Sequence, residues 1–197
     1  MFGRMMLLVV LVSMLFATVA LAAGLNIVGS ELKLRRDFAP ATSVYLYTDN
    51  GAEYGPGVFT LPSIGKDFGQ VYAGPRLNAF SFIEVGGGAG IEMDGTGRDL
   101  TFYRRYAALA FTNAPVGSHK LSTNYFYERG EGAGPAWQRF ESFVDVTPTV
   151  TLGATIQSTA GFGPRIGYAL PKSGSLFNAA LWRGGKLTNV TSITFSY

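Results

Sequence analysis

An alternation of apolar and polar side chains runs from Phe80 to the end of the chain and limits the possible folds more than any other feature. It is clearest from Leu187 to Tyr197 (LTNVTSITFSY), where Ile193, Phe195 and Tyr197 alternate with serine and threonine. Side chains of an extended chain point alternately to its two faces, so this stretch predicts a strand with one apolar and one polar face. Because the chain stops on an aromatic while the strand pattern is still running, we expect a closed barrel that pairs this strand on both edges.

Turn-forming clusters such as Asp94-Gly95-Thr96-Gly97 and Thr147-Pro148 divide this region into strand-sized segments. We expect eight strands there, at about residues 80 to 93, 100 to 112, 119 to 129, 136 to 146, 149 to 157, 162 to 170, 175 to 183 and 187 to 197. Thr42 to Thr48 and Phe68 to Leu77 predict two more, which makes ten. Eight strands would leave residues 23 to 79 as an extension, and twelve would add residues 25 to 37 and a weak segment near residues 58 to 61. Ten strands are preferred over eight, and eight over twelve.

The composition agrees with an all-β chain. There are 26 glycines, 15 phenylalanines and 10 tyrosines, and only 15% of the residues are charged. Glycine destabilises helices and aromatic residues favour pleated sheets. The net charge of +3 is dispersed rather than clustered on one face, so the sequence does not favour nucleic-acid binding.

The closing pattern resembles that of bacterial outer-membrane β-barrel proteins, in which a final aromatic residue with apolar residues at alternate positions before it acts as an assembly signal. This resemblance implies a transmembrane antiparallel up-and-down β-barrel, with Ile193, Phe195 and Tyr197 as the signal. It also implies that the partners are outer-membrane lipid including lipopolysaccharide, the barrel-assembly machinery and periplasmic chaperones. We expect a monomeric, porin-like protein of a Gram-negative bacterium, with no nucleic-acid partner.

The start of the chain predicts export. Met1 to Arg4 is basic, Met5 to Ala20 is apolar apart from Ser13 and Thr18, and small residues follow at Ala20-Leu21-Ala22. This pattern predicts a signal peptide over residues 1 to 22, leaving residues 23 to 197 as a single barrel domain. The chain has no cysteine, which excludes disulfides, a lipoprotein anchor and thiolate metal sites.

Charged residues fall on the polar face of successive strands, so we expect them inside the barrel. Lys120 would lie opposite Asp145, and Arg139 diagonal to Glu128, if the hairpin is symmetric around residues 132 and 133. Of the consecutive pair Arg104 and Arg105, we expect Arg104 inside and Arg105 facing lipid headgroups. The expected lumen network consists of Glu84, Glu92, Arg104, Lys120, Glu128, Arg139, Glu141, Asp145 and Arg165.

Motifs for catalysis, metals and cofactors are weak. His119 is the only histidine, and its neighbour Ser118 would point to the opposite face of a strand, so the two cannot act as nucleophile and base. The run from Gly86 to Gly90 lacks the Gly-Lys-Ser/Thr that follows in a phosphate loop, and indicates close strand packing instead. We expect no catalytic residues, no metal and no cofactor.

We therefore expect a non-enzymatic outer-membrane barrel that is either a structural component of the envelope or a narrow channel for small solutes. Two alternatives stay open. One is an outer-membrane enzyme acting on lipid, and the other is a soluble exported β-sandwich that binds a partner through exposed aromatic residues.

Overall fold

The computed structural model describes residues 25–35, 41–49, 54–65, 68–80, 82–94, 101–131, 136–171 and 174–196. These residues form twelve strands and no helix. The strands are β1 (Leu25–Arg35), β2 (Ala41–Asp49), β3 (Gly55–Gly65), β4 (Phe68–Ala79), β5 (Ile83–Asp94), β6 (Thr101–Val116), β7 (His119–Gly130), β8 (Trp137–Asp145), β9 (Val150–Gln157), β10 (Gly161–Leu170), β11 (Gly174–Arg183) and β12 (Lys186–Ser196).

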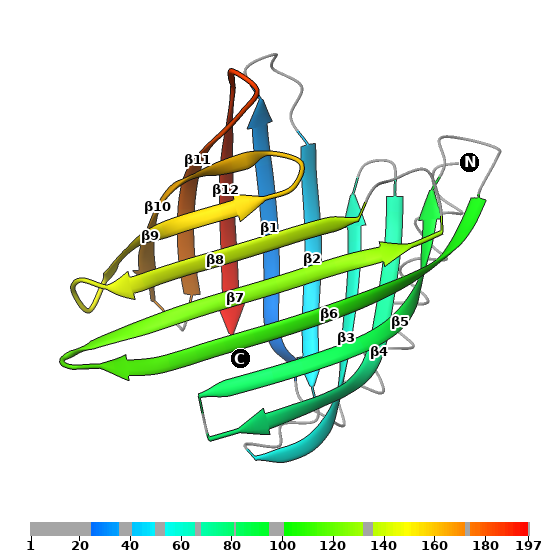
Figure 1. The fold of residues 1–197 in the computed structure, drawn as a ribbon, viewed down its shortest axis with the longest axis horizontal. Helices are drawn as coiled ribbons and strands as arrows, with labels where there is room; N and C mark the ends of the chain where they lie inside the picture. The colour runs from blue at the N-terminus through cyan, green and yellow to red at the C-terminus, as the bar shows by residue number, and fades with distance from the viewer. Residues whose placement is uncertain are drawn as a thin grey trace.

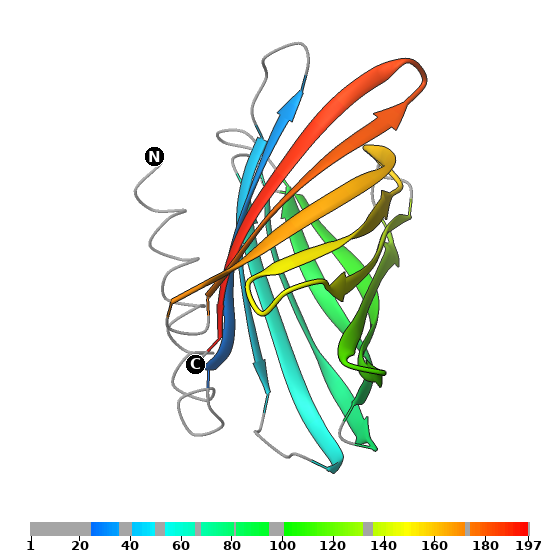
Figure 2. The same cartoon turned by 90° about the vertical axis from the view of Figure 1, so that its left-hand side faces the viewer.

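Each strand pairs with its neighbours in sequence, and β1 closes the barrel by pairing antiparallel with β12 (Figure 1). Figure 2 shows the first strand, in blue, beside the last, in red. Since Ile27 pairs with Ser196, the start of β1 and the end of β12 lie at the same end of the barrel. We call this the termini end; it also carries the β4–β5, β6–β7 and β8–β9 turns. The distal end carries the β7–β8, β9–β10 and β11–β12 connections.

The strand number is twelve, so the preferred prediction of ten is wrong and the twelve-strand alternative is right. The two additional strands are β1 and β3. Pro56 and Pro62 interrupt the alternation in β3, although Leu77 and Val71 pair with them in the ladder to β4. The stretch between residues 48 and 68, which the ten-strand prediction left without a strand, therefore contains β3.

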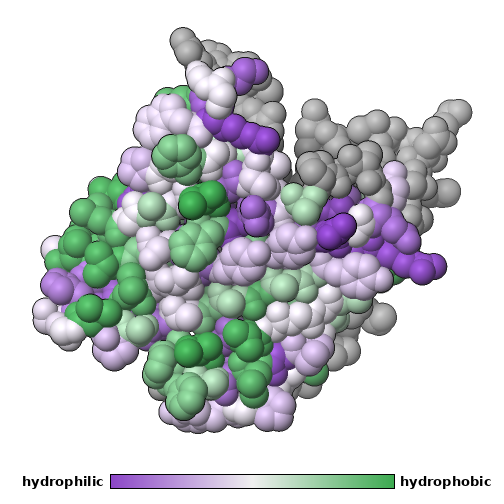
Figure 3. Space-filling model, viewed as in Figure 1, coloured by the Kyte–Doolittle hydropathy of each residue, from purple (hydrophilic) through white to green (hydrophobic). Residues whose placement is uncertain are grey.

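Apolar side chains face outward on the strands where alternation predicts it. Val85, Ile91, Phe140, Leu152 and Ile156 are 41% to 53% exposed. Figure 3 shows apolar surface gathered over the β8–β9 turn on its left and over the β4–β5 turn at its bottom. The outer face of these strands is therefore rich in apolar side chains.

The last strand separates its two faces as predicted. Ser192 is 1% exposed inside the barrel, whereas Ile193 is 40% exposed outside it. Phe195 pairs with Val28 of β1 and Gly174 of β11. Tyr197 and the expected signal peptide, residues 1 to 22, lie outside the described residues. No helix among the described residues is long and apolar enough to cross a membrane.

Candidate functional site in the barrel interior

Arg105 of β6 joins carboxylates from two neighbouring strands inside the barrel. Its Nε lies 3.5 Å from Glu92 Oε2 on β5, and its Nη2 lies 3.6 Å from Glu128 Oε2 on β7. Gln70 on β4 donates to Glu128 Oε1 over 3.1 Å. Arg105 is 5% exposed and Glu128 is 7% exposed, so the pairs are shielded from solvent.

The predicted roles of Arg104 and Arg105 are reversed. Arg105 faces the lumen, and Arg104 is exposed on the outer face. By the period of two, Arg105 shares a face with Tyr103 and Leu109, whose largely apolar character favours a lipid-facing side. Leu109 is instead 2% exposed inside the barrel, where it belongs to an apolar cluster with Phe59.

That apolar cluster lies inside the barrel, on the same face of β6 as Arg105. It consists of Phe59, Tyr72, Ala107 and Leu109, with Leu61, Phe111 and Phe126 packed against it. The glycines of β5 leave space for it, because a Cβ at Gly86 would stand 3.2 Å from both Leu109 and Phe59. A Cβ at Gly90 would lie 2.0 Å from the carbonyl oxygen of Val71, so close strand packing explains the glycine run as predicted.

A second charged group surrounds Glu141 on β8. Arg139 donates from Nε and Nη2 to Glu141 Oε1 over 2.9 and 2.7 Å, and Arg165 Nε of β10 lies 4.0 Å from the same oxygen. Asn124 Nδ2 on β7 lies 3.4 Å from Glu141 Oε2. Two guanidinium groups and one carboxylate give this group a formal charge of +1, whereas Glu92, Arg105 and Glu128 carry −1.

Aromatic rings hold Arg165 in place. Its guanidinium carbon lies 3.8 Å from the centroid of the Phe143 ring and 4.3 Å from that of Phe177. Arg165 also lies opposite Gly153 on β9 and Ala179 on β11, whose small size leaves room for the two rings. A planar cation between two aromatic faces is favourable where water is excluded.

Sequence reasoning missed one buried ion pair. Arg76 Nη1 on β4 lies 3.4 Å from Glu84 Oε2 on β5, and Arg76 is 3% exposed. The available signal was the period of two in β4, which places Arg76 on the same face as Gln70. Glu84 itself lies on the inner face, as predicted.

The predicted register of the β7–β8 hairpin is confirmed, but Lys120 and Asp145 do not belong to the buried network. Leu121 pairs with Val144 and Glu128 with Trp137, which places Arg139 diagonal to Glu128. Lys120 is exposed and Asp145 half-buried at the rim of the termini end. Strand length explains the difference, because both residues lie at the ends of their strands.

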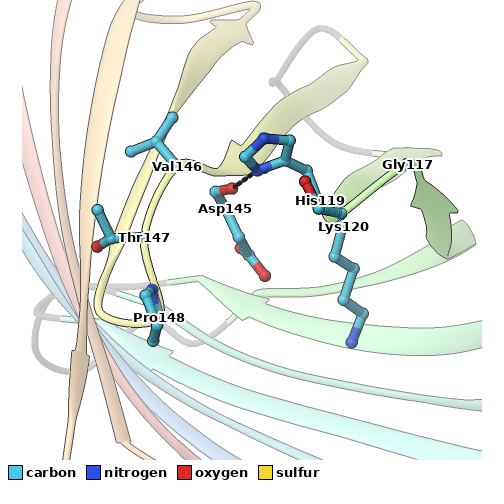
Figure 4. A pocket seen from close by; sticks show the side chains of 8 residues that line it. Gly117, His119, Lys120, Asp145, Val146, Thr147 and Pro148 are labelled. Carbon is cyan, nitrogen blue, oxygen red and sulfur yellow. Dashed lines mark hydrogen bonds between the residues drawn. The ribbon is translucent and has the colours of Figure 1, made fainter.

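His119 sits in a rim pocket between the β6–β7 and β8–β9 turns (Figure 4). Its Nδ1 lies 2.7 Å from the backbone carbonyl oxygen of Asp145, so this nitrogen donates to a main-chain acceptor. The side chain ties two hairpins together. In the part of the chain that the structure describes, no three His, Cys, Asp or Glu side chains are placed to hold a metal ion.

The chain matches no family model and no curated protein. Among solved structures, it is similar to the outer membrane protein Omp33 of Acinetobacter baumannii, with 8% identity, a TM-score of 0.53 and coverage of 89% of this chain and 100% of that one. The translocator domain of the autotransporter NalP from Neisseria meningitidis matches at 10% identity and a TM-score of 0.40, over 88% of each chain. A mutant Rh. blastica porin matches at 6% identity and a TM-score of 0.31, over 88% of this chain and 99% of that one.

The similarity to Omp33 concerns the fold alone. Together with the closed antiparallel sheet, it shows that this chain folds as a small closed antiparallel β-barrel like that of Omp33. Its interior is lined by ion pairs and packed aromatic side chains.

Proposed function

We propose that this protein is a non-enzymatic outer-membrane β-barrel whose lumen is closed by its own side chains, and that it serves as a structural component of the envelope. The observation that carries the proposal is the burial of the inner-wall ion pairs. Arg105, Glu128, Glu141 and Arg165 are all 8% exposed or less, although they face the centre of the barrel. An open aqueous channel would hydrate such groups.

The even number of strands supports an orientation. In bacterial barrels of this kind, both chain ends face the periplasm. The termini end would then be periplasmic, and the distal end would face the cell surface. Assembly would use the closing strand, with Ile193 and Phe195 read by the barrel-assembly machinery after delivery by periplasmic chaperones.

A narrow channel for small solutes is the second candidate. It is favoured by the opposite formal charges of the two interior groups, −1 around Arg105 and +1 around Glu141. A polar solute could pass through the lumen only if some of these side chains moved aside.

Cell fractionation and conductance test these proposals. The protein is expected in the outer-membrane fraction, with a gel mobility that changes on heating, as folded barrels show. In planar bilayers we expect no steady current at any voltage, and a regular single-channel current would replace the structural role by the channel. Recovery of the protein in soluble extracts would refute both.

A non-enzymatic role predicts that the purified protein releases no fatty acid from phospholipid vesicles. Hydrolysis that disappears in His119→Ala would instead support a lipid-modifying enzyme.

A further inference from the structure

Two arginines and a tyrosine form an exposed group on the outer face of the barrel, near its distal end. Arg104 and Tyr106 lie near the start of β6, and Arg129 lies near the end of β7. Tyr106 pairs directly with Arg129 and is 59% exposed. Arg104 lies two residues before Tyr106 and therefore points to the same face, diagonal to Arg129.

The guanidinium groups of Arg104 and Arg129 differ from those of the interior in their ion-pair contacts. Arg105 and Arg139 are engaged by carboxylates at 2.7 to 3.6 Å. Within the described ranges, neither Arg104 nor Arg129 has an ion-pair partner, and both are exposed. Both arginines are thus available to an external ligand.

One acidic residue belongs to the same neighbourhood. The backbone N–H of Glu131 donates to the carbonyl oxygen of Arg104 over 2.9 Å, and the Glu131 side chain is exposed. Counting Arg104, Arg129 and Glu131, the group keeps a formal charge of +1. It would attract an anion rather than a cation.

The position of this group on the barrel suggests which anion would bind to it. On the proposed orientation, the distal ends of β6 and β7 reach the outer leaflet. Arg104 and Arg129 lie closer to the distal end than Ala108 and Tyr127, which pair with each other on the same outer face. Phosphate groups of the membrane lipid are the abundant anions at this depth. Arginine binds phosphate through two parallel hydrogen bonds, and diagonal positions on paired strands are about 7–8 Å apart at most, close enough for two arginines to reach one phosphate.

We propose that Arg104, Tyr106 and Arg129 form a binding site for a phosphate of the outer-leaflet lipid, lipopolysaccharide. Arg104 and Arg129 contact the phosphate oxygens, and Tyr106 packs against the sugar and acyl-chain boundary of the same molecule. The site rests on the proposed function for its membrane depth.

The test uses the full barrel, folded in a zwitterionic detergent and titrated with the lipid portion of lipopolysaccharide while complexes are counted by native mass spectrometry. We expect the Arg104→Ala/Arg129→Ala variant to bind about tenfold or more weakly than the wild type, the loss that removal of charge-assisted hydrogen bonds implies. Dephosphorylated lipid should bind the wild type as weakly as intact lipid binds the variant. Equal binding of intact lipid by wild type and variant would overturn the proposal.

Two controls separate this site from general attraction. Arg183 is an exposed arginine at the same end, and its Nη1 donates to the carbonyl oxygen of Ser158, so Arg183→Ala should keep wild-type lipid binding. A loss in Arg183→Ala as large as in the double variant would refute a localised site. Inorganic phosphate alone should not compete, and competition at the same concentration as the lipid would refute a lipid ligand.

Failure of the site and failure of the proposed function give different results. The titration is carried out in micelles and does not depend on where the cell places the protein. Soluble recovery in fractionation would refute the function, whereas wild-type binding by the double variant would refute only the site.

Discussion

Arg105 on β6 lies directly opposite Gly130 on β7, and on its other side it lies opposite Gly90 on β5. Neither neighbour has a side chain, so the guanidinium can lie across both strands. Its two carboxylate partners, Glu92 and Glu128, come from the diagonal positions on those same strands. The two glycines are therefore part of the ion-pair site.

Removal of the central guanidinium should destabilise the barrel. Arg105→Ala leaves the carboxylates of Glu92 and Glu128 without the cation that they share, and Glu128 is only 7% exposed. We expect a loss of about 3–5 kcal/mol in the free energy of unfolding. Urea unfolding in detergent micelles, followed by tryptophan fluorescence, measures this. Arg104→Ala, one residue away on the outer face, should change the free energy by less than about 0.5 kcal/mol. Equal losses in the two variants would contradict the assignment of faces.

Neighbouring glycines of β5 should respond differently to alanine. Gly90→Ala places a Cβ 2.0 Å from the Val71 carbonyl oxygen, whereas Gly87→Ala places one 3.7 Å from the nearest atom, the Ala107 carbonyl oxygen. We expect Gly90→Ala to reduce the amount of folded barrel, as judged by heat-dependent gel mobility. Gly87→Ala should fold normally. A normal yield of Gly90→Ala would show that β4 and β5 do not approach each other this closely.

The aromatic rings around Arg165 predict that lysine at this position gives a less stable barrel. Arg165→Lys keeps the charge but loses the planar contact with Phe143 and Phe177 at 3.8 and 4.3 Å. We expect a loss of about 1–2 kcal/mol in unfolding free energy. Arg183→Lys at the exposed rim serves as the matched control and should be neutral. Wild-type stability of Arg165→Lys would mean that only charge matters at this position.

Cysteine scanning should test the two faces directly, since the natural chain contains no cysteine. Ile156 is 51% exposed and Thr155 is 0% exposed. In lipid vesicles, a fluorophore on Ile156→Cys should be quenched by spin-labelled lipid tails. Thr155→Cys should react poorly with the fluorophore and show no such quenching. Similar labelling and quenching at both positions would argue against a barrel with a packed interior.

Sequence reasoning succeeded where the two faces of a strand differ in polarity. On β9, Leu152 and Ile156 alternate with Thr151 and Thr155, and the structure places the apolar residues outside. It failed on β6, because the consecutive residues Leu109 and Ala110 point to opposite faces and are both apolar. The hydrophobic pattern of β6 therefore does not distinguish its inner face from its outer face. The inward direction of the Arg105 side chain follows instead from the space above Gly90 and Gly130, the residues that pair with it.

Local residue patterns are sufficient to predict the antiparallel all-β architecture, the faces of β5, β7, β8 and β9, and the register of the β7–β8 hairpin. These follow from local rules, namely the period of two and the symmetry of a turn. The number of strands, twelve, and the inward position of Arg105 rather than Arg104 are established by the assembled barrel alone. Both depend on which strands meet and on the space that their glycines leave, and a single strand read in isolation does not contain that information.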